Sequence, residues 1–174
     1  MTVNLQSSDF ELFGVPERFA QEPAAIDARW KDLQREVHPD RFSAQGASAQ
    51  RVAMQWSVRV NEAYQRLRDP LKRAADLCER RGAPINAENN TAMPGAFLIE
   101  QMAWREALEE ATSEPELDAL HTTLTSAREE ALARIGALLD DAGDAQAAAQ
   151  QVRALMFIER FAHDVEARFE QLGQ

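Results

Sequence analysis

The chain has 174 residues, of which 45% are apolar, and its formal net charge at pH 7 is −10. This length and composition are those of a folded protein with an apolar core, arranged as one ordinary domain or two small ones. The single cysteine, Cys78, excludes an intramolecular disulfide, and no group of cysteine and histidine residues has the spacing of a zinc or iron–sulfur site. We therefore expect no bound metal and no cofactor.

Targeting and membrane signals are also missing from the sequence. Residues 1–9 contain neither the basic residues nor the apolar core of a signal peptide. No apolar stretch approaches the roughly 18 residues that a membrane-spanning helix needs. We expect a cytoplasmic protein that does not enter a membrane.

Charge is distributed unevenly along the chain. Residues 1–82 hold 13 Lys and Arg against 12 Asp and Glu, whereas residues 83–174 hold 6 against 17. Between Arg80 and Pro94, glycine, proline and asparagine cluster without helical periodicity. We predict two domains, residues 1–80 and 94–174, joined by a linker over residues 81–93. The acidic C-terminal half disfavours nucleic-acid binding, because it would repel phosphate groups.

The first predicted helix lies within residues 22–38. Pro23 suits the first turn of a helix, where its missing N–H would have had no partner. Pro39 ends the helix, because the residue before a proline is pushed out of the α conformation. Apolar residues recur every three or four positions and so share one face: Ile26, Trp30, Leu33 and Val37.

A second helix is predicted after a polar loop that runs through Gly46. Two amphipathic helices joined by about ten residues can pack antiparallel with their apolar faces together. The tripeptide His38-Pro39-Asp40 would then project from the closed end of a helical hairpin. The apolar face of the second helix comprises Val52, Trp56, Val60, Ala63, Tyr64 and Leu67.

The helix before the tripeptide is locally basic. On charge alone, a solvated helix face with intrahelical ion pairs is as good an interpretation as a docking surface. The adjacent loop favours a docking surface. Four cationic residues lie within 13 positions: Arg29, Lys31, Arg35 and Arg41.

Three more helices are predicted beyond the linker, and the short turns between them indicate an antiparallel three-helix bundle. The first runs from Met93 or Pro94 to about Thr112. The second opens with a capping box over residues 113–116 and ends near residues 141–143. Asp144 can cap the third. The fold class is therefore all-α.

The first helix of this bundle has two apolar faces. One face carries Phe97, Trp104, Leu108 and Ala111, and the roughly opposite face carries Leu98, Ile99, Met102 and Ala103. On the third helix, Phe157 falls off the main apolar stripe and is expected to point outward. The second face is either buried against the N-terminal hairpin or exposed, together with Phe157, as a surface for a partner protein.

Several segments together resemble the HscB family, the J-domain co-chaperones of iron–sulfur cluster assembly. The tripeptide His38-Pro39-Asp40 alone is typical of any J-domain. General J-proteins would carry a Gly/Phe-rich segment or zinc-binding cysteine repeats after that domain, and neither is present. The narrower matches span nearly the whole chain: residues 10–16, 33–42, 60–64, 67–74, 96–102 and 153–158.

The resemblance implies a helical hairpin of the J-domain type, a non-catalytic role and two protein partners. His38, Pro39 and Asp40 match the residues that stimulate ATP hydrolysis by a DnaK-type, HscA-like chaperone, and the four cationic residues match the face that docks on it. Residues 94–174 match a three-helix bundle for oligomerisation and for binding an IscU-like iron–sulfur scaffold protein. Ala103 stands where the family often has an acidic residue, and we expect Glu106 to compensate. The remaining positions that match the scaffold-binding patch are Leu98, Ile99, Met102 and Phe157.

Other interpretations of the sequence stay open at this point. One is a general J-domain co-chaperone, and another is a helical adaptor with a different client in which the tripeptide is coincidental. A metal-dependent enzyme would need His38 and Asp40 to meet another histidine. That is disfavoured, because His121 and His163 are predicted to lie singly on polar helix faces.

Overall fold

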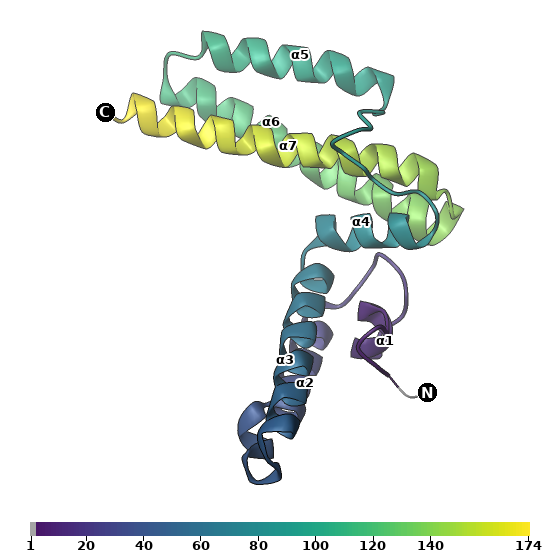
Figure 1. The fold of residues 1–174 in the computed structure, drawn as a ribbon. Coiled ribbons are helices and arrows are strands. Elements are labelled where there is room, and N and C mark those ends of the chain that lie inside the picture. The colour runs from purple at the N-terminus through teal and green to yellow at the C-terminus, as the bar shows by residue number, and fades with distance from the viewer. Residues whose placement is uncertain (1–2) are drawn as a thin grey trace. The chain divides into compact units, whose positions relative to one another are not determined.

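The computed structural model describes residues 3–174, and every regular element within that range is helical. The all-α prediction is confirmed. The chain divides into two compact units, and the boundary along the sequence lies between Leu77 and Cys78. Figure 1 shows the helices in chain order.

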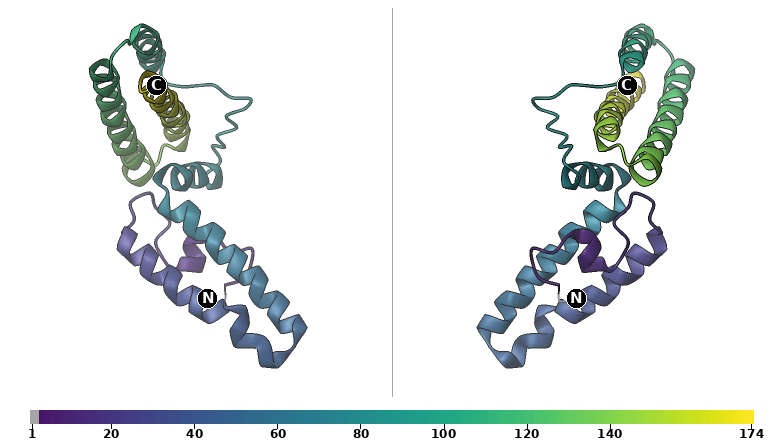
Figure 2. Two further views of the ribbon diagram at one scale, coloured as in Figure 1. Left: turned by 90° about the vertical axis from the view of Figure 1, so that its left-hand side faces the viewer. Right: turned by 90° about the vertical axis from the view of Figure 1, so that its right-hand side faces the viewer.

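The N-terminal unit is built on a helical hairpin. Helices α2 (Pro23–Val37) and α3 (Ala47–Arg68) pack along each other, as Figure 2 shows from two sides. The bounds of α2 confirm its predicted start at Pro23 and its end before Pro39. A short 3-10 helix, η1 (Pro39–Gln45), closes the hairpin where the sequence predicted a plain loop.

Two further helices of this part of the chain escaped prediction. Helix α1 (Asp9–Phe13) packs on the hairpin, and α4 (Pro70–Arg80) follows α3 after one residue. Ser8 caps α1, because its Oγ accepts a hydrogen bond from the Glu11 N–H at 3.1 Å. Helix α1 ends at Gly14, whose φ of 63° is left-handed.

One residue of the predicted apolar face of α3 is exposed. Val52 is 50% exposed, and the neighbouring Ala53 is buried instead. At about 100° per residue, Val52 lies roughly 80° away from the buried Val60, whereas Ala53 lies within about 20° of it. The other buried apolar residues include Phe10, Leu12, Phe13, Ile26, Leu33, Ala63 and Leu67.

A buried carboxylate fastens the N-terminal segment to α3. Asp9 accepts hydrogen bonds from Arg59 Nη1 at 2.8 Å and from Arg66 Nε at 2.6 Å. Burial alone would raise the pKa of Asp9, but the hydrogen bonds from the two guanidinium groups outweigh it and hold that pKa below its usual value. Arg59 also donates to the carbonyls of Leu5 and Ser7. Residues 5–9 are thereby fixed to α3.

The C-terminal unit contains α5 (Gly95–Glu110), α6 (Glu114–Gly136) and α7 (Ala145–Leu172) as an antiparallel bundle. Both predicted N-terminal caps are present. Ser113 Oγ accepts from the Glu116 N–H at 3.4 Å, and Asp144 accepts from the Ala147 N–H at 3.0 Å. Glu116 reaches back to the N–H of Thr112, one residue before the cap position.

The second helix of the bundle does not run unbroken to its predicted end. It gives way to a π-helical turn, η2 (Ala137–Ala142), which ends at Gly143 with a left-handed φ of 67°. Helix α7 is the central element, since buried residues line much of its circumference. In the part of the chain that the structure describes, no helix is long and apolar enough to span a membrane.

Candidate functional site

The loop at the closed end of the hairpin presents two polar side chains to solvent. The side chain of Asp40 is 91% exposed and that of His38 is 55% exposed. The Asp40 N–H donates to His38 Nδ1 at 3.2 Å, so a neutral imidazole carries its proton on Nε2. Ser43 Oγ donates to the Asp40 carbonyl at 3.0 Å. The loop backbone is therefore held by its own residues, and the Asp40 carboxylate, 3.6 Å from His38 Nδ1, is open to solvent.

The predicted basic residues lie beside this loop. Lys31, Arg35 and Arg41 are exposed, and Arg29 is half-buried. Arg41 Nη1 donates to the Arg35 carbonyl at 3.1 Å and so satisfies one of the free carbonyls at the end of α2. Together with Gln34, three of these loop and helix residues line a shallow hollow: Arg35, His38 and Arg41.

Contacts between α2 and α3 hold the basic helix in place. The Trp30 and Tyr64 rings stack with centroids 4.7 Å apart. Trp30 Nε1 donates to Asn61 Oδ1 at 3.0 Å, and the Tyr64 hydroxyl donates to Asp27 Oδ1 at 2.7 Å. That hydrogen bond raises the pKa of Tyr64 and lowers that of Asp27. The sequence indicated Trp30 and Tyr64 only as core residues, whereas both are half-buried.

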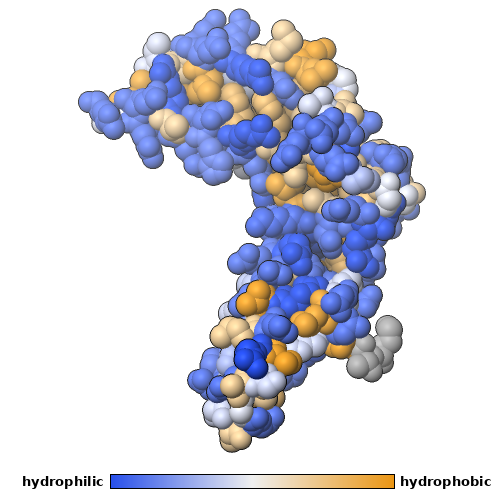
Figure 3. Space-filling model, in the orientation of Figure 1, coloured by the Kyte–Doolittle hydropathy of each residue, from blue (hydrophilic) through white to orange (hydrophobic). Residues whose placement is uncertain are grey.

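The outer face of α5 carries an exposed apolar surface. Leu98 is 54% exposed, and Ile99 and Met102 are each 72% exposed. Within the C-terminal unit this face is exposed. Glu106 is exposed one turn after Met102. An apolar area over the N-terminal part of α5 is visible in Figure 3.

Phe157 does not point outward, and that prediction was wrong. Its side chain is half-buried in an aromatic cluster between α5 and α7. Its ring stacks on Phe161 with centroids 5.8 Å apart and meets the edge of Phe97 at 5.8 Å. The Arg105 guanidinium lies 5.4 Å from its centroid. Phe157 falls off the stripe that faces α6 because α7 has a second buried face toward α5.

The metal-enzyme interpretation finds no support in the arrangement of side chains. Among residues 3–174, no group of three His, Cys, Asp or Glu side chains could hold a metal ion. His121 and His163 do not lie singly, because both line one hollow between α6 and α7. His163 Nδ1 is 3.4 Å from Glu166 Oε2.

Sequence reasoning missed two arginines of α7 that contact the backbone around α5. Arg153 is buried and donates to carbonyls of the segment before α5. Arg168 donates to the Ala111 carbonyl at the end of α5. In the sequence, Arg153 interrupts an otherwise apolar run over residues 152–158, and this interruption was the one available signal.

Comparison with known proteins places this geometry in a family. The model of the HscB C-terminal oligomerisation domain matches residues 93–166. The co-chaperone protein HscB homologs of Burkholderia multivorans and Burkholderia cenocepacia are 53% and 51% identical to the chain over 173 residues, which cover 98% of each protein and 98% of this chain. The chain belongs to the HscB family. It is thus a co-chaperone of iron–sulfur cluster assembly and not an enzyme.

Solved HscB structures share the fold. Chaperone HscB from Vibrio cholerae is 34% identical, with a TM-score of 0.81, and the alignment covers 95% of this chain and 99% of that one. Human co-chaperone HscB is 24% identical, with a TM-score of 0.88, over 97% of this chain and 85% of that one. Membership of the HscB family also removes the general J-protein and the unrelated adaptor as interpretations.

Proposed function

We propose that this HscB-family co-chaperone stimulates the ATPase of a DnaK-type, HscA-like chaperone and delivers an IscU-like iron–sulfur scaffold protein to it. The supporting observation is that two exposed surfaces of different chemistry belong to different units. One is the polar His38-Pro39-Asp40 loop with its basic flank, and the other is the apolar outer face of α5. In this proposal residues 1–80 act as the J-domain, residues 81–93 as the linker and residues 94–174 as the scaffold-binding bundle.

The loop would act on the chaperone through charge. The exposed Asp40 carboxylate can accept charge-assisted hydrogen bonds from an arginine of the chaperone. Arg29, Lys31, Arg35 and Arg41 would steer the docking onto an acidic surface. Such binding stimulates hydrolysis when it favours the chaperone conformation that can hydrolyse ATP, because a partner shifts an equilibrium only by binding one state better.

The scaffold would be held mainly by burial of apolar area on α5. Leu98, Ile99 and Met102 are exposed side chains of the size found in the centre of protein interfaces. Glu106 would add a polar contact at the rim of this surface. Phe157 would support α5 by packing against its inner face from α7. Binding both partners on one chain raises the effective concentration of scaffold at the chaperone, which couples delivery to hydrolysis.

A chaperone ATPase assay with and without scaffold tests the proposal. Asp40→Asn and His38→Gln should abolish most of the stimulation, while scaffold affinity measured by calorimetry stays that of the parent. Loss of one charge-assisted hydrogen bond should raise the co-chaperone concentration needed for half-maximal stimulation roughly tenfold to hundredfold. Asp118→Asn, an equally conservative change at an exposed position of α6, serves as the control. Full stimulation by Asp40→Asn would contradict the proposal.

A further inference from the structure

Helix α5 carries the apolar surface, yet its N-terminus has no capping side chain to fix where the helix starts. Its N-cap position is Pro94, and no side chain caps it. Gly95 begins the helix after a stretch, residues 83–94, that contains no helix. Of the first N–H groups, that of Phe97 bonds to the Pro94 carbonyl at 3.0 Å. Contacts from outside the helix must therefore fix the start of α5.

One buried arginine of α7 supplies those contacts. Arg153 is 5% exposed, and its guanidinium donates to three carbonyls of the segment before α5. Nε bonds to Ile85 at 3.0 Å, Nη1 to Ala92 at 3.0 Å and Nη2 to Pro84 at 3.3 Å. Ala92 lies three residues before Gly95, where the helix starts. A planar guanidinium holds such a set of acceptors in a fixed geometry, which an ammonium group does not.

A second arginine of α7 holds the other end. Arg168 Nη2 donates at 3.2 Å to the carbonyl of Ala111, the C-cap residue of α5. Its Nη1 donates to Gln171 on its own helix at 3.2 Å. Carbonyls that flank α5 on both sides are thus bonded to one neighbouring helix.

The packing between these two ends is aromatic. Phe97 and Trp104 of α5 meet Phe157 and Phe161 of α7, with centroids 5.8 and 6.4 Å apart. Ring packing of this kind has its own preferred geometry and holds the middle of α5 against α7. Hydrogen bonds to carbonyls at both ends are directional. Together with the ring contacts, they set which face of α5 is turned outward.

We infer that Arg153 and Arg168 are positioning residues for the scaffold-binding surface. They act through the position of α5. By fixing α5 on α7 at both ends, they keep Leu98, Ile99 and Met102 on the exposed face of α5. They also keep α5 packed on Phe157, which lies one turn after Arg153 on α7. This role in binding rests on the proposed function, whereas the anchoring of α5 can be measured without any partner.

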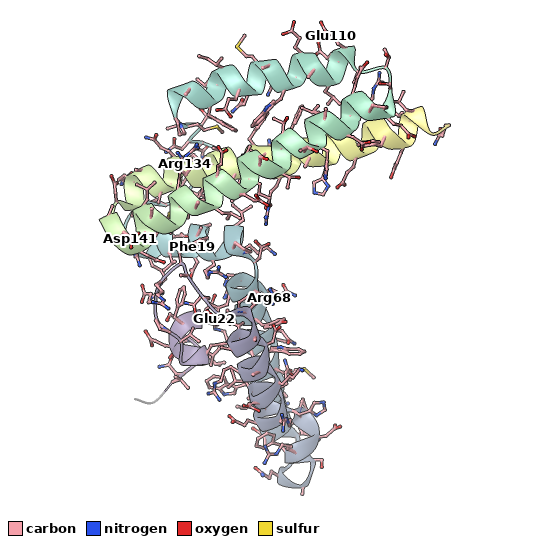
Figure 4. All side chains as sticks on the ribbon, turned by 180° about the vertical axis from the view of Figure 1, so that it is seen from behind. Phe19, Glu22, Arg68, Glu110, Arg134 and Asp141 are labelled. Carbon is pink, nitrogen blue, oxygen red and sulfur yellow. The ribbon has the colours of Figure 1, made fainter. Side chains whose placement is uncertain are left out.

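The test compares two variants with a matched control in the full-length protein. Arg153→Lys keeps the charge but not the fork of donors, and Arg168→Gln removes one partly buried contact without emptying the core. Arg134→Gln is the control, because Arg134 (labelled in Figure 4) is an exposed α6 residue paired only within its helix, with Glu130. Each protein is measured by amide hydrogen exchange, by calorimetry with the scaffold protein, and by chaperone ATPase stimulation without scaffold.

Exchange in residues 92–111 should accelerate about tenfold in both variants, the equivalent of one charged hydrogen bond, while α6 and the middle of α7 keep the parent's protection. Scaffold affinity should fall by a similar factor, and stimulation without scaffold should not change. Faster exchange spread evenly over the three helices, or parental exchange in residues 92–111, would overturn the inference. If exchange changes as expected but the parent itself does not bind the scaffold, the anchoring stands and the proposed function fails.

Discussion

The exposed fractions on α5 predict how much each residue contributes to scaffold binding. Burying an Ile, Leu or Met side chain completely is worth about 1.5–3 kcal/mol. Ile99 and Met102 have 72% of their surface left to bury and Leu98 has 54%. Complete burial would thus yield about 1–2 kcal/mol for each of the first two and about 0.8–1.6 kcal/mol for Leu98. Ile99→Ala and Met102→Ala should each weaken binding about 5- to 30-fold, and Leu98→Ala somewhat less.

Calorimetric titration with the scaffold protein at two salt concentrations measures this ranking. Affinities should depend little on salt, because apolar burial carries the binding. The control is Val58→Ala on α3, an apolar side chain that is 50% exposed in the other unit, and it should leave the affinity unchanged. A loss concentrated in Leu98→Ala, with parental affinity for Ile99→Ala and Met102→Ala, would refute the argument from exposed area.

Other parts of the chain give three further predictions. Asp9→Asn leaves Arg59 and Arg66 without their buried partner and should cost about 3 kcal/mol of unfolding free energy at pH 7, measured with urea. Because the folded-state pKa of Asp9 is lowered, its contribution is complete above the unfolded pKa of about 3.9 and disappears as pH falls through the folded value, so parent and variant should converge in acid. Burial raises the pKa of the Cys78 thiol to about 11, despite nearby arginines, so a thiol reagent at pH 8 should react only after unfolding. Gly14→Ala, at a left-handed φ of 63° with no atom near the added Cβ, should lower stability by about 1 kcal/mol in thermal unfolding.

Local signals in the sequence were sufficient for the start and end of α2 and for the starts of α6 and α7. Pro23 and Pro39 act on their own backbone, and Ser113 and Asp144 cap N–H groups within three residues, so neither depends on the rest of the fold. The second apolar face of α5 could also be predicted from the sequence. Apolar residues opposite a buried stripe either pack against another part of the chain or are exposed. Those residues are exposed within the C-terminal unit.

Features that depend on contacts between two distant segments could not be predicted from such local signals. Phe157 was predicted to face solvent because periodicity identifies one buried face, whereas a central helix such as α7 has two. By periodicity, Arg153 lies opposite the predicted apolar stripe of α7, so it resembles a solvent-exposed charge until the carbonyls of Pro84, Ile85 and Ala92 are seen around it. A buried arginine is tolerated only with such partners. Their positions follow from the path of residues 83–92, a path that no periodic pattern encodes.

The loop at the end of the hairpin illustrates why an exposed site can still be well ordered. Its polar backbone groups are used internally, since Asp40 donates to His38, Ser43 donates to Asp40, and the Arg41 N–H donates to the His38 carbonyl at 3.0 Å. Binding a partner therefore need not break these hydrogen bonds or order this segment, which are two of the usual costs of association. The groups left exposed are the Asp40 carboxylate, which lies 3.6 Å from His38 Nδ1, and the His38 imidazole, an acceptor and a donor on one short turn. In the proposed function, the fold would serve recognition by holding the backbone of the tripeptide and leaving the His38 and Asp40 side chains exposed.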